Sequence, residues 1–195
     1  MNDSDRTAVS RARDGDGEAF RWLVERHSRY LFGVAARLTG SAADAEDVVQ
    51  EAWLKAHRQL ARFEERADVR TWLHRITVNC AIDFIRARRH REDSHDPADL
   101  EQGTLGEIGA DSQPTPERLA EGGQIQARVG EAMARLTGLE RAAFTLRHLE
   151  GMSIEEVGAA LGLKASATKH SIFRAVRKMR AALEPFATGK GAGCS

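Results

Sequence analysis

Apolar residues recur every three or four positions along the first half of the chain, with polar residues between them. This is the period of an amphipathic helix that buries one stripe of side chains. Three segments show it: residues 18–40, 42–60 and 68–91. Their apolar positions are Phe20, Leu23, Val24, Leu31, Val34 and Leu38 in the first, Val48, Ala52 and Leu54 in the second, and Val69, Leu73, Ile76, Cys80 and Phe84 in the third. The pattern predicts three helices that share one core.

Polar residues and glycine mark the boundary between the first two of these helices. Gly40 follows the first segment, and glycine is favoured just past the end of a helix. Ser41, with Asp44 three residues later, resembles a capping box, so it predicts the start of the second helix. We expect Trp22, Trp53 and Trp72 to lie in the core, because each falls within the apolar pattern.

The helical period returns after residue 124. The segments "QARVGEAMARLTG" (126–138) and "ERAAFTLRHLEG" (140–151) predict two helices, the second ended by Gly151. Ser153 and Glu156 form a capping box for the short helix "IEEVGAALG". A turn through Gly162 leads to "SATKHSIFRAVRKMR" (166–180), for which Ser166 is the expected N-cap. Two helices joined by such a tight turn are typical of a helix-turn-helix.

The segment between the two halves differs in composition. Residues 92–121 hold nine acidic residues against one basic residue, with Gly, Pro and Ser interspersed. This composition favours a flexible linker. We therefore predict an all-α protein of two small helical domains, residues 10–92 and 124–184. A flexible acidic linker (93–123) joins them, and a flexible tail (185–195) follows.

Positive charge is concentrated on the last helix, although the whole chain balances 29 basic against 29 acidic residues. Residues 166–180 hold five Lys or Arg and no acidic residue. One face carries Ile172, Val176, Met179 and Leu183, which we expect to pack inward. The opposite face carries Lys169, His170, Phe173, Arg174 and Arg177, with Lys178 beside it. A cationic helix in a helix-turn-helix fits the DNA major groove. The alternative is a solvated helix with a basic C-terminal turn, which the helix dipole favours.

Several classes of protein are not indicated by the chain. No segment approaches the roughly 20 apolar residues of a membrane span, and the polar, acidic N-terminus is unlike a signal or transit peptide. We therefore expect a cytoplasmic protein without membrane insertion. The two cysteines, Cys80 and Cys194, and the seven histidines show no metal-ligand spacing, so we expect no metal and no cofactor. The motifs of nucleophilic or phosphate-binding enzymes are missing from the sequence, so we predict that it is not an enzyme.

Three strings together resemble a known family. They are "DAEDVVQEAWLKAHRQLARF" (44–63), "TWLHRITVNCAIDFIRARRHR" (71–91), and "LRHLEGMSIEEVGAALGL" (146–163) followed by "IFRAVRKMR". They are similar to the extracytoplasmic-function (ECF) subgroup of bacterial RNA polymerase sigma factors, over about residues 10–92 and 124–184. The resemblance implies a transcription initiation factor that binds core RNA polymerase, recognises two promoter elements and helps to melt the DNA. A stand-alone helix-turn-helix regulator is the alternative.

The resemblance also implies roles for individual residues. Asp44, Asp47, Gln50 and Glu51 would face the clamp helices of the largest polymerase subunit, and the flap of the second largest subunit would be a further contact. The residues expected at the minus-ten element are Phe63 at the start of the matching segment, His74, Arg75 and Asn79 for a flipped base, and Arg86, Arg88 and Arg89 for phosphates. Those expected at the minus-thirty-five element are Lys169, His170, Ser171, Phe173, Arg174, Arg177 and Lys178. An anti-sigma protein is an implied further partner.

Overall fold

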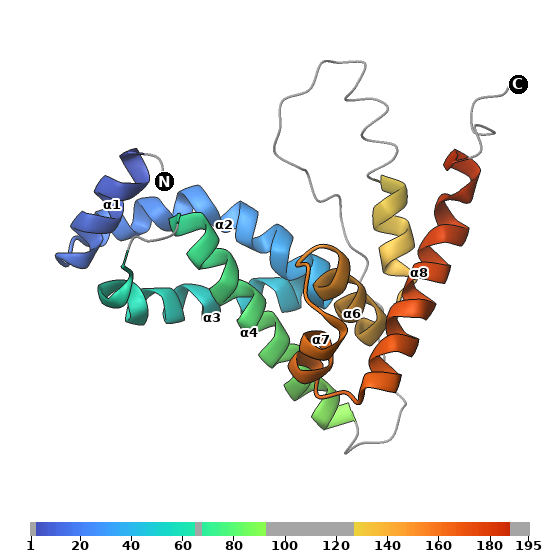
Figure 1. Ribbon diagram of the computed structural model, residues 1–195. Coiled ribbons are helices and arrows are strands. Elements are labelled where there is room, and N and C mark those ends of the chain that lie inside the picture. The colour runs from blue at the N-terminus through green and yellow to red at the C-terminus, as the bar shows by residue number, and fades with distance from the viewer. Residues whose placement is uncertain (1–2, 65–67, 93–126, 188–195) are drawn as a thin grey trace, which may run out of the picture. The chain divides into compact units, whose positions relative to one another are not determined.

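The computed structural model describes residues 3–64, 68–92 and 127–187, and these form two separate compact units within Met1–Leu100 and Glu101–Ser195 (Figure 1). Every regular element among the described residues is helical, which confirms the predicted all-α fold class. The predicted acidic linker (93–123) lies outside the described residues, as do residues 188–195 of the predicted tail. The domain limits therefore stay predictions.

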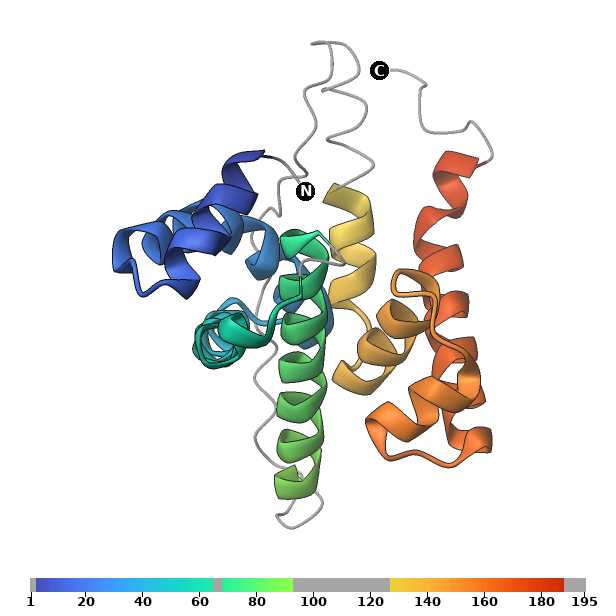
Figure 2. The same ribbon diagram turned by 60° about the vertical axis from the view of Figure 1, so that its left-hand side comes forward.

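Unit 1, which we define as the described residues 3–92, packs its helices around one apolar core (Figure 2). Its elements are α1 (Asp3–Arg13), α2 (Gly17–Thr39), α3 (Ala42–Gln59), the short 3-10 helix η1 (Leu60–Arg62) and α4 (Val69–Glu92). Helices α2, α3 and α4 pack against one another, and α1 lies against α2. The side chains at its centre are Leu23, Leu31, Val34, Leu38, Val48, Ala52, Val69, Leu73, Ile76 and Cys80. The inward stripes predicted for residues 18–40 and 68–91 are thus largely confirmed, although Phe20, Val24 and Phe84 are only half-buried.

The predicted boundary between α2 and α3 is confirmed in detail. Gly40 ends α2 with a φ of 76°, a left-handed conformation that glycine adopts without strain. Ser41 then caps α3, because its hydroxyl accepts the Asp44 N–H at 3.3 Å. At the other end of α2, the Asp16 carboxylate accepts the N–H groups of Glu18 and Ala19.

Helix α1 was not predicted, because its segment is mostly polar. Ala8 and Val9 are its buried apolar residues, and a third buried side chain is the carboxylate of Asp5. Asp5 Oδ1 lies 3.2 Å from Nε2 of the buried His27 and 3.1 Å from Nε of Arg26. Polar contacts of this kind leave no hydrophobic period in the sequence, so pattern analysis passes over the helix.

Unit 2, which we define as residues 127–187, contains the helix-turn-helix. Residues 127–134 are helical and are followed by α6 (Gly138–His148), α7 (Ile154–Leu161) and α8 (Ala165–Ala187). Ala132, Met133, Leu136, Ala175 and Met179 form an apolar cluster that joins the first of these helices to α8. The buried Arg141 donates hydrogen bonds to the carbonyls of Met133, Ala134 and Leu136, which satisfies the end of the helix 127–134.

Glycine and capping boxes set the turn between α7 and α8. Thr137 caps α6 and Ser153 caps α7. In each box the cap hydroxyl accepts a backbone N–H from a glutamate three residues later, and the side chain of that glutamate accepts the backbone N–H of the cap residue. The capping box predicted at Ser153 is therefore confirmed. Gly162 ends α7 with a φ of 64°. Helices α7 and α8 approach so closely that a Cβ on Gly158 would lie 3.0 Å from Thr168 Oγ1. A larger residue at position 158 would force Thr168 or the backbone at Leu163 to shift by a few tenths of an ångström.

Two predicted helix boundaries in unit 2 are wrong. Helix α6 ends at His148 and not at Gly151, whose φ of 72° instead shapes the following turn. Ser166 is not the cap of α8, because α8 begins at Ala165 and Ser166 already lies in its first turn. None of the described helices is long and apolar enough to cross a membrane.

We predict that unit 1 loses stability in mild acid because of His27. Burial lowers the pKa of His27 below its ordinary value of about 6.5, and Asp5 only partly opposes this effect. The unfolded chain therefore takes up the proton first, so the free energy of unfolding should fall as the pH drops below about 6.5. All three tryptophans lie in unit 1, so the midpoint of urea unfolding monitored by tryptophan fluorescence reports on this unit.

The variant H27Q should flatten this pH dependence between pH 7.5 and 5. The control H57Q changes a histidine that is exposed on α3 and should retain the wild-type pH dependence. Equal slopes for H27Q and the wild type would contradict the prediction.

Candidate polymerase- and DNA-binding faces

The outward side of α3 carries acidic and amide side chains around one exposed leucine. Asp47, Gln50 and Glu51 are all exposed, and their three- and four-residue spacing puts them on one stripe. Leu54 lies three residues beyond Glu51 on the same stripe and is 53% exposed. We call Asp47, Gln50, Glu51 and Leu54 the α3 face.

The prediction that Leu54 packs inward is wrong. The inward side of α3 is filled by Val48, Val49, Ala52 and Trp53. Trp53 also donates a hydrogen bond from Nε1 to Ser28 Oγ at 3.0 Å, which holds the indole towards α2. With that position taken, Leu54 is left outside the core. The sequence contained a signal for this exposure, because Asp47, Gln50 and Glu51 are polar and share a helical stripe with Leu54.

Asp44, the fourth residue predicted to bind the polymerase, has a different environment. Its side chain is 22% exposed and pairs with Arg88 Nη1 of α4 at 2.9 Å. A second ion pair, between Lys55 and Asp83 at 3.4 Å, links the same two helices. Asp44 therefore joins α3 to α4, the helix that carries the residues predicted at the minus-ten element.

Phe63 and Trp72 exchange the places that the sequence predicts for them. Phe63, expected at the DNA, is buried at 5% exposure, and its backbone N–H is tied to Leu60 at the end of η1. Trp72, expected in the core, is half-buried and lies against the Phe63 ring at a centroid distance of 4.8 Å. Phe63 is therefore a support beneath an aromatic side chain that reaches the surface. Trp22 is also half-buried, whereas Trp53 is buried as predicted.

Helix α4 presents an outward polar stripe near its start. Arg75 and Asn79 are exposed one turn apart, whereas His74 is half-buried. The Nδ1 atom of His74 lies 2.9 Å from the hydroxyl of Tyr30, a residue of α2 that the sequence analysis did not single out. The Arg70 guanidinium covers the same tyrosine ring at 3.9 Å.

Towards its C-terminus α4 becomes basic. Arg86 and Arg91 are exposed, Arg89 is half-buried, and Arg88 is the partner of Asp44. The structure thus brings Arg75, Asn79 and Arg86 to the outer side of one helix. Arg88 and Arg89 lie partly inside that surface.

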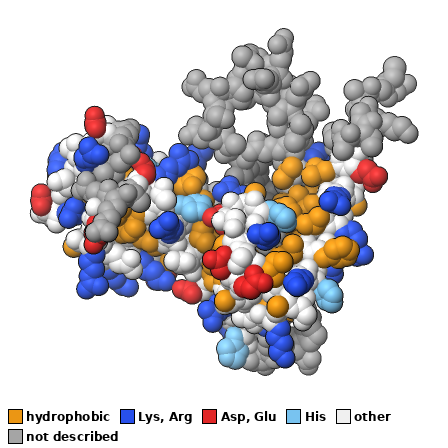
Figure 3. Space-filling view, in the orientation of Figure 1, with side chains coloured by type: hydrophobic (Ala, Val, Ile, Leu, Met, Phe, Trp, Pro, Cys, Tyr) orange, Lys and Arg blue, Asp and Glu red, His pale blue; other side chains and the backbone are white. Residues whose placement is uncertain are grey.

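The outward side of α8 has the predicted character. Lys169, His170, Phe173, Arg174 and Arg177 are all exposed, and Phe173 at 64% exposure is an apolar ring in water among cations. We call these five residues the α8 face. In Figure 3 basic and apolar side chains alternate on the surface over this helix. The remaining predicted residues of α8, Ser171 and Lys178, do not share this exposure.

Ser171 is a correction, because it is 2% exposed and lies in the buried stripe of α8. That stripe consists of Thr168, Ser171, Ala175 and Met179, whereas Ile172 and Val176, expected at its centre, are only half-buried. Two neighbours cover this stripe: Thr168 lies against Gly158 of α7, and Ala175 and Met179 pack in the cluster with Ala132, Met133 and Leu136.

A buried carboxylate connects α6 with α8. Glu140 of α6 lies 2.6 Å from Lys178 Nζ and 3.3 Å from Arg174 Nε. It also accepts the Thr137 N–H at 3.0 Å as part of the capping box. Burial works to raise the pKa of Glu140, but the hydrogen bonds from Lys178 and Thr137 and the positive charges of Lys178 and Arg174 outweigh it and hold that pKa below its ordinary value. Glu140 is therefore ionised at neutral pH.

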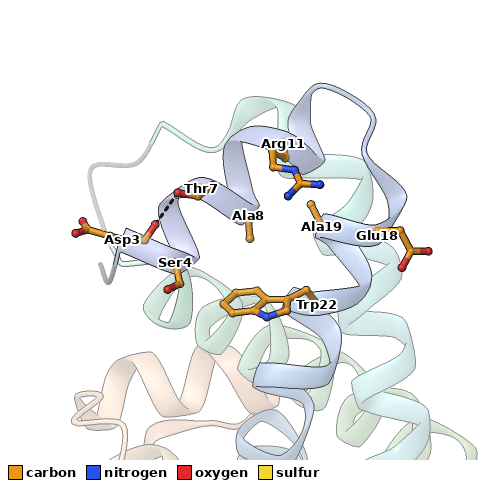
Figure 4. Close-up of a pocket in the computed structure, with 8 residues that line it drawn as sticks. All are labelled: Asp3, Ser4, Thr7, Ala8, Arg11, Glu18, Ala19 and Trp22. Carbon is orange, nitrogen blue, oxygen red and sulfur yellow. Dashed lines mark hydrogen bonds between the residues drawn. The ribbon is translucent and has the colours of Figure 1, made fainter.

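Unit 1 also has a hollow of about 570 Å³ between α1 and α2, shown in Figure 4. Trp22 lies on one side of it, with Ala8 and Ala19 nearby and Arg11 at the rim. None of the predicted binding residues lines it. Among the described residues no cluster of three or more His, Cys, Asp or Glu side chains could hold a metal ion.

The helix-turn-helix and the α3 face together define a class of protein. One helical unit presents a cationic helix in a helix-turn-helix, which is the geometry of a DNA-binding module. The other presents an acidic and apolar helix face beside a basic helix. Such a chain combines DNA binding with a second surface of different chemistry.

Comparison with known proteins identifies the family. The model of "Sigma-70 region 2" matches residues 23–104, and that of "Sigma-70, region 4" matches residues 126–179. The RNA polymerase sigma-H factor of Pseudomonas aeruginosa is 33% identical over 184 residues, which cover 94% of this chain and 95% of that protein. The ECF RNA polymerase sigma-E factor of Escherichia coli is 34% identical over 173 residues, which cover 88% of this chain and 90% of that protein.

Among solved structures, the sigma factor RpoE of Bartonella quintana, crystallised with the anti-sigma factor NepR, aligns with a TM-score of 0.51. It is 22% identical and covers 85% of this chain and 96% of its own. The chain belongs to the extracytoplasmic-function sigma factors of the sigma-70 family. It is a transcription initiation factor that directs RNA polymerase to promoters, and the stand-alone regulator is not favoured.

The exposure of Leu54 yields a prediction about stability. Replacing Leu54 by Ala should change the free energy of unfolding by no more than about 0.5 kcal/mol, as expected of an exposed site. Replacing the fully buried Leu31 by Ala should cost about 2–5 kcal/mol. Urea unfolding monitored by tryptophan fluorescence measures both. A loss of more than about 1.5 kcal/mol for L54A would show that Leu54 packs in a core.

Proposed function

We propose that the α3 face binds core RNA polymerase, with Leu54 as its apolar centre. The support is the combination of an exposed leucine with Asp47, Gln50 and Glu51 on a helix whose other side is packed. Burying such a leucine in an interface is worth about 1.5–3 kcal/mol, and the carboxylates around it favour a basic partner surface. The resemblance assigns this surface to the clamp helices of the largest subunit.

We assign the flap of the second largest subunit to unit 2, where Leu149 is 54% exposed after α6.

The minus-ten element is proposed to bind the outer side of α4. Arg75, Asn79 and Arg86 are the exposed contacts, and Trp72 replaces Phe63 as the aromatic side chain near the surface. His74 takes part through its bond to Tyr30, as a residue that fixes the local surface. Arg88 and Arg89 would reach phosphates at the edge of this region.

The α8 face is proposed to read the minus-thirty-five element. Its guanidinium and ammonium groups suit phosphates and guanine edges, and the Phe173 ring suits a thymine methyl group. Lys178 contributes charge from beside this face, whereas Ser171 supports the packing of α8 on α7. In this proposal the protein supplies binding and positioning, and the phosphodiester chemistry belongs to the polymerase. Since polymerase and chromosome share the bacterial cytoplasm, we place its action there.

The α3 face and the α8 face also suggest how the protein is held inactive. An anti-sigma protein that covers Leu54 or Phe173 would block polymerase or promoter. We propose such a partner on the strength of family membership and of these exposed apolar side chains. Added to the holoenzyme, it should release the sigma factor from core polymerase, and the variant L54D should weaken its binding. An unchanged affinity for both L54D and F173A would contradict this assignment.

Run-off transcription with purified core polymerase tests the main proposal. Fragments of the protein's own genome should yield new start sites only when the protein is present. The double variant K169A/R174A should lose these transcripts while it still binds core polymerase, because the α3 face is unchanged. L54D should lose core binding itself, since it places a charge at the apolar centre of that face.

Two controls carry matched changes away from these faces. R128A removes an exposed cation of unit 2, and S10D adds an acid on the exposed side of α1. Both variants should transcribe like the wild type. Tight binding to duplex DNA without polymerase, together with no new start sites, would overturn the proposal in favour of a stand-alone regulator.

A further inference from the structure

Glu140 is a buried charge placed directly behind the α8 face. Its side chain is 3% exposed, whereas that of Arg174 is 54% exposed and that of Lys178 is 38% exposed. The two cations lie one helical turn apart on α8, and both reach the same carboxylate. Glu140 itself is out of reach of solvent and DNA, so any effect on DNA must pass through these two side chains.

The two carboxylate oxygens have different partners. Oε1 pairs with Nε of Arg174 at 3.3 Å, and Oε2 takes both Nζ of Lys178 and the Thr137 N–H. Two capping bonds fix Glu140 at the start of α6. Its carboxylate accepts the Thr137 N–H, and its own backbone N–H donates to the Thr137 hydroxyl oxygen. The Nε side of the Arg174 guanidinium thus forms an ion pair with a carboxylate whose own position is fixed.

A guanidinium whose Nε side faces its ion-pair partner still offers the donors on its two terminal nitrogens. These donors lie in one plane and form the fork that pairs with the O6 and N7 atoms of guanine. A free surface arginine must lose rotamer freedom to make this contact, whereas a held one has already lost much of it. Pre-orientation of this kind favours a directed contact with a base edge over a non-directed contact with a phosphate.

We propose that Glu140 is a positioning residue that orients Arg174 towards a guanine edge in the minus-thirty-five element. A carboxylate that never touches DNA thus sets the base preference at one position of the promoter. This inference rests on the proposed function of the α8 face. It assigns a role to a residue that sequence analysis placed only within a helix.

Glu156 provides a matched control within the same unit. It closes the capping box of α7 with Ser153, just as Glu140 closes that of α6 with Thr137. Glu156 is exposed, and the groups that lower its pKa belong to Ser153. Changing Glu156 to Gln removes a capping carboxylate without touching α8.

The experiment uses the holoenzyme of core polymerase with the wild type, E140Q, E156Q or R174Q. Each holoenzyme selects from duplexes that carry a mapped promoter with its minus-thirty-five positions randomised, and the bound fraction is sequenced. E140Q should lower the preference for G at one or two adjacent positions by about tenfold, the scale of one bidentate base contact. E156Q should select like the wild type. R174Q should lose the same preference as E140Q, and the double variant E140Q/R174Q should lose no more than R174Q alone.

A merely structural role for Glu140 would give a different result. E140Q keeps every cation of the α8 face, so the affinity for DNA of unrelated sequence should not fall. If that affinity fell together with the helical signal at 222 nm and with an unchanged base preference, Glu140 would be only a packing residue. If E140Q folds poorly, R174Q alone tests the proposal. An R174Q holoenzyme with the base preference of the wild type and a weaker salt dependence of DNA binding would show that Arg174 contacts a phosphate, which would overturn the proposal. If the wild type selects no sequence at all, then the proposed function of the α8 face has failed, which is a separate outcome.

Discussion

The close contact between α7 and α8 at Gly158 and Thr168 is the constraint on which the DNA-facing unit depends. A Cβ at position 158 would lie 3.0 Å from Thr168 Oγ1 and 3.1 Å from the Leu163 carbonyl oxygen, so the two helices are tightly packed at this point. Thr168 is buried at this contact, and Ala175 of the same stripe is buried against Ala132, Met133 and Leu136. The opposite stripe, with Lys169, Phe173 and Arg177, must then face outward. The orientation of the cationic face is thus a consequence of where two backbones approach.

Packing in unit 1 likewise decides which sides of α3 and α4 face outward. Helix α3 buries Val48, Ala52 and Trp53, and α4 buries Leu73 and Ile76. Ion pairs between α3 and α4, such as Asp44 with Arg88, fasten these helices beside each other. Under the proposed function α3 contacts polymerase and α4 contacts promoter DNA, so such a link would keep the two surfaces aligned.

Carboxylates behind cations recur in both units. Asp44 lies behind Arg88, and Glu140 lies behind Arg174 and Lys178. In each case the cation forms an ion pair with a carboxylate of the same protein, and this pairing restricts the motion of the cationic side chain. A surface that attracted every phosphate equally would bind DNA without selecting it. Held cations favour contacts with a defined direction, which a promoter-selective protein requires.

Much of the fold was predictable from the sequence, because helix period, glycine ends and capping boxes are local properties. Residues 18–40 and 68–91, the Ser41 cap and the cationic side of α8 follow from neighbours within a few positions along the chain. Helix α1 was missed, since its burial depends on Asp5 meeting His27 across 22 positions. Leu54 was misplaced for a related reason, because periodicity defines a stripe only to within one position on either side. Phe63 and Ser171 were assigned to DNA by the family resemblance, which does not tell which side chains this fold buries.

The sequence by itself therefore determined that this chain forms two helical units, that one of them presents a basic helix-turn-helix, and which family it belongs to. Only the tertiary structure decided which side chains at the edges of each stripe face inward. It left Leu54 exposed while its neighbour Trp53 joins the core, and it buried Ser171 in the same stripe of α8 as Thr168, which lies against Gly158 of α7. It also brought Glu140 to Arg174 and Lys178, a contact that spans 38 positions in the case of Lys178. Such contacts depend on the shape of a neighbouring helix, which no local pattern encodes.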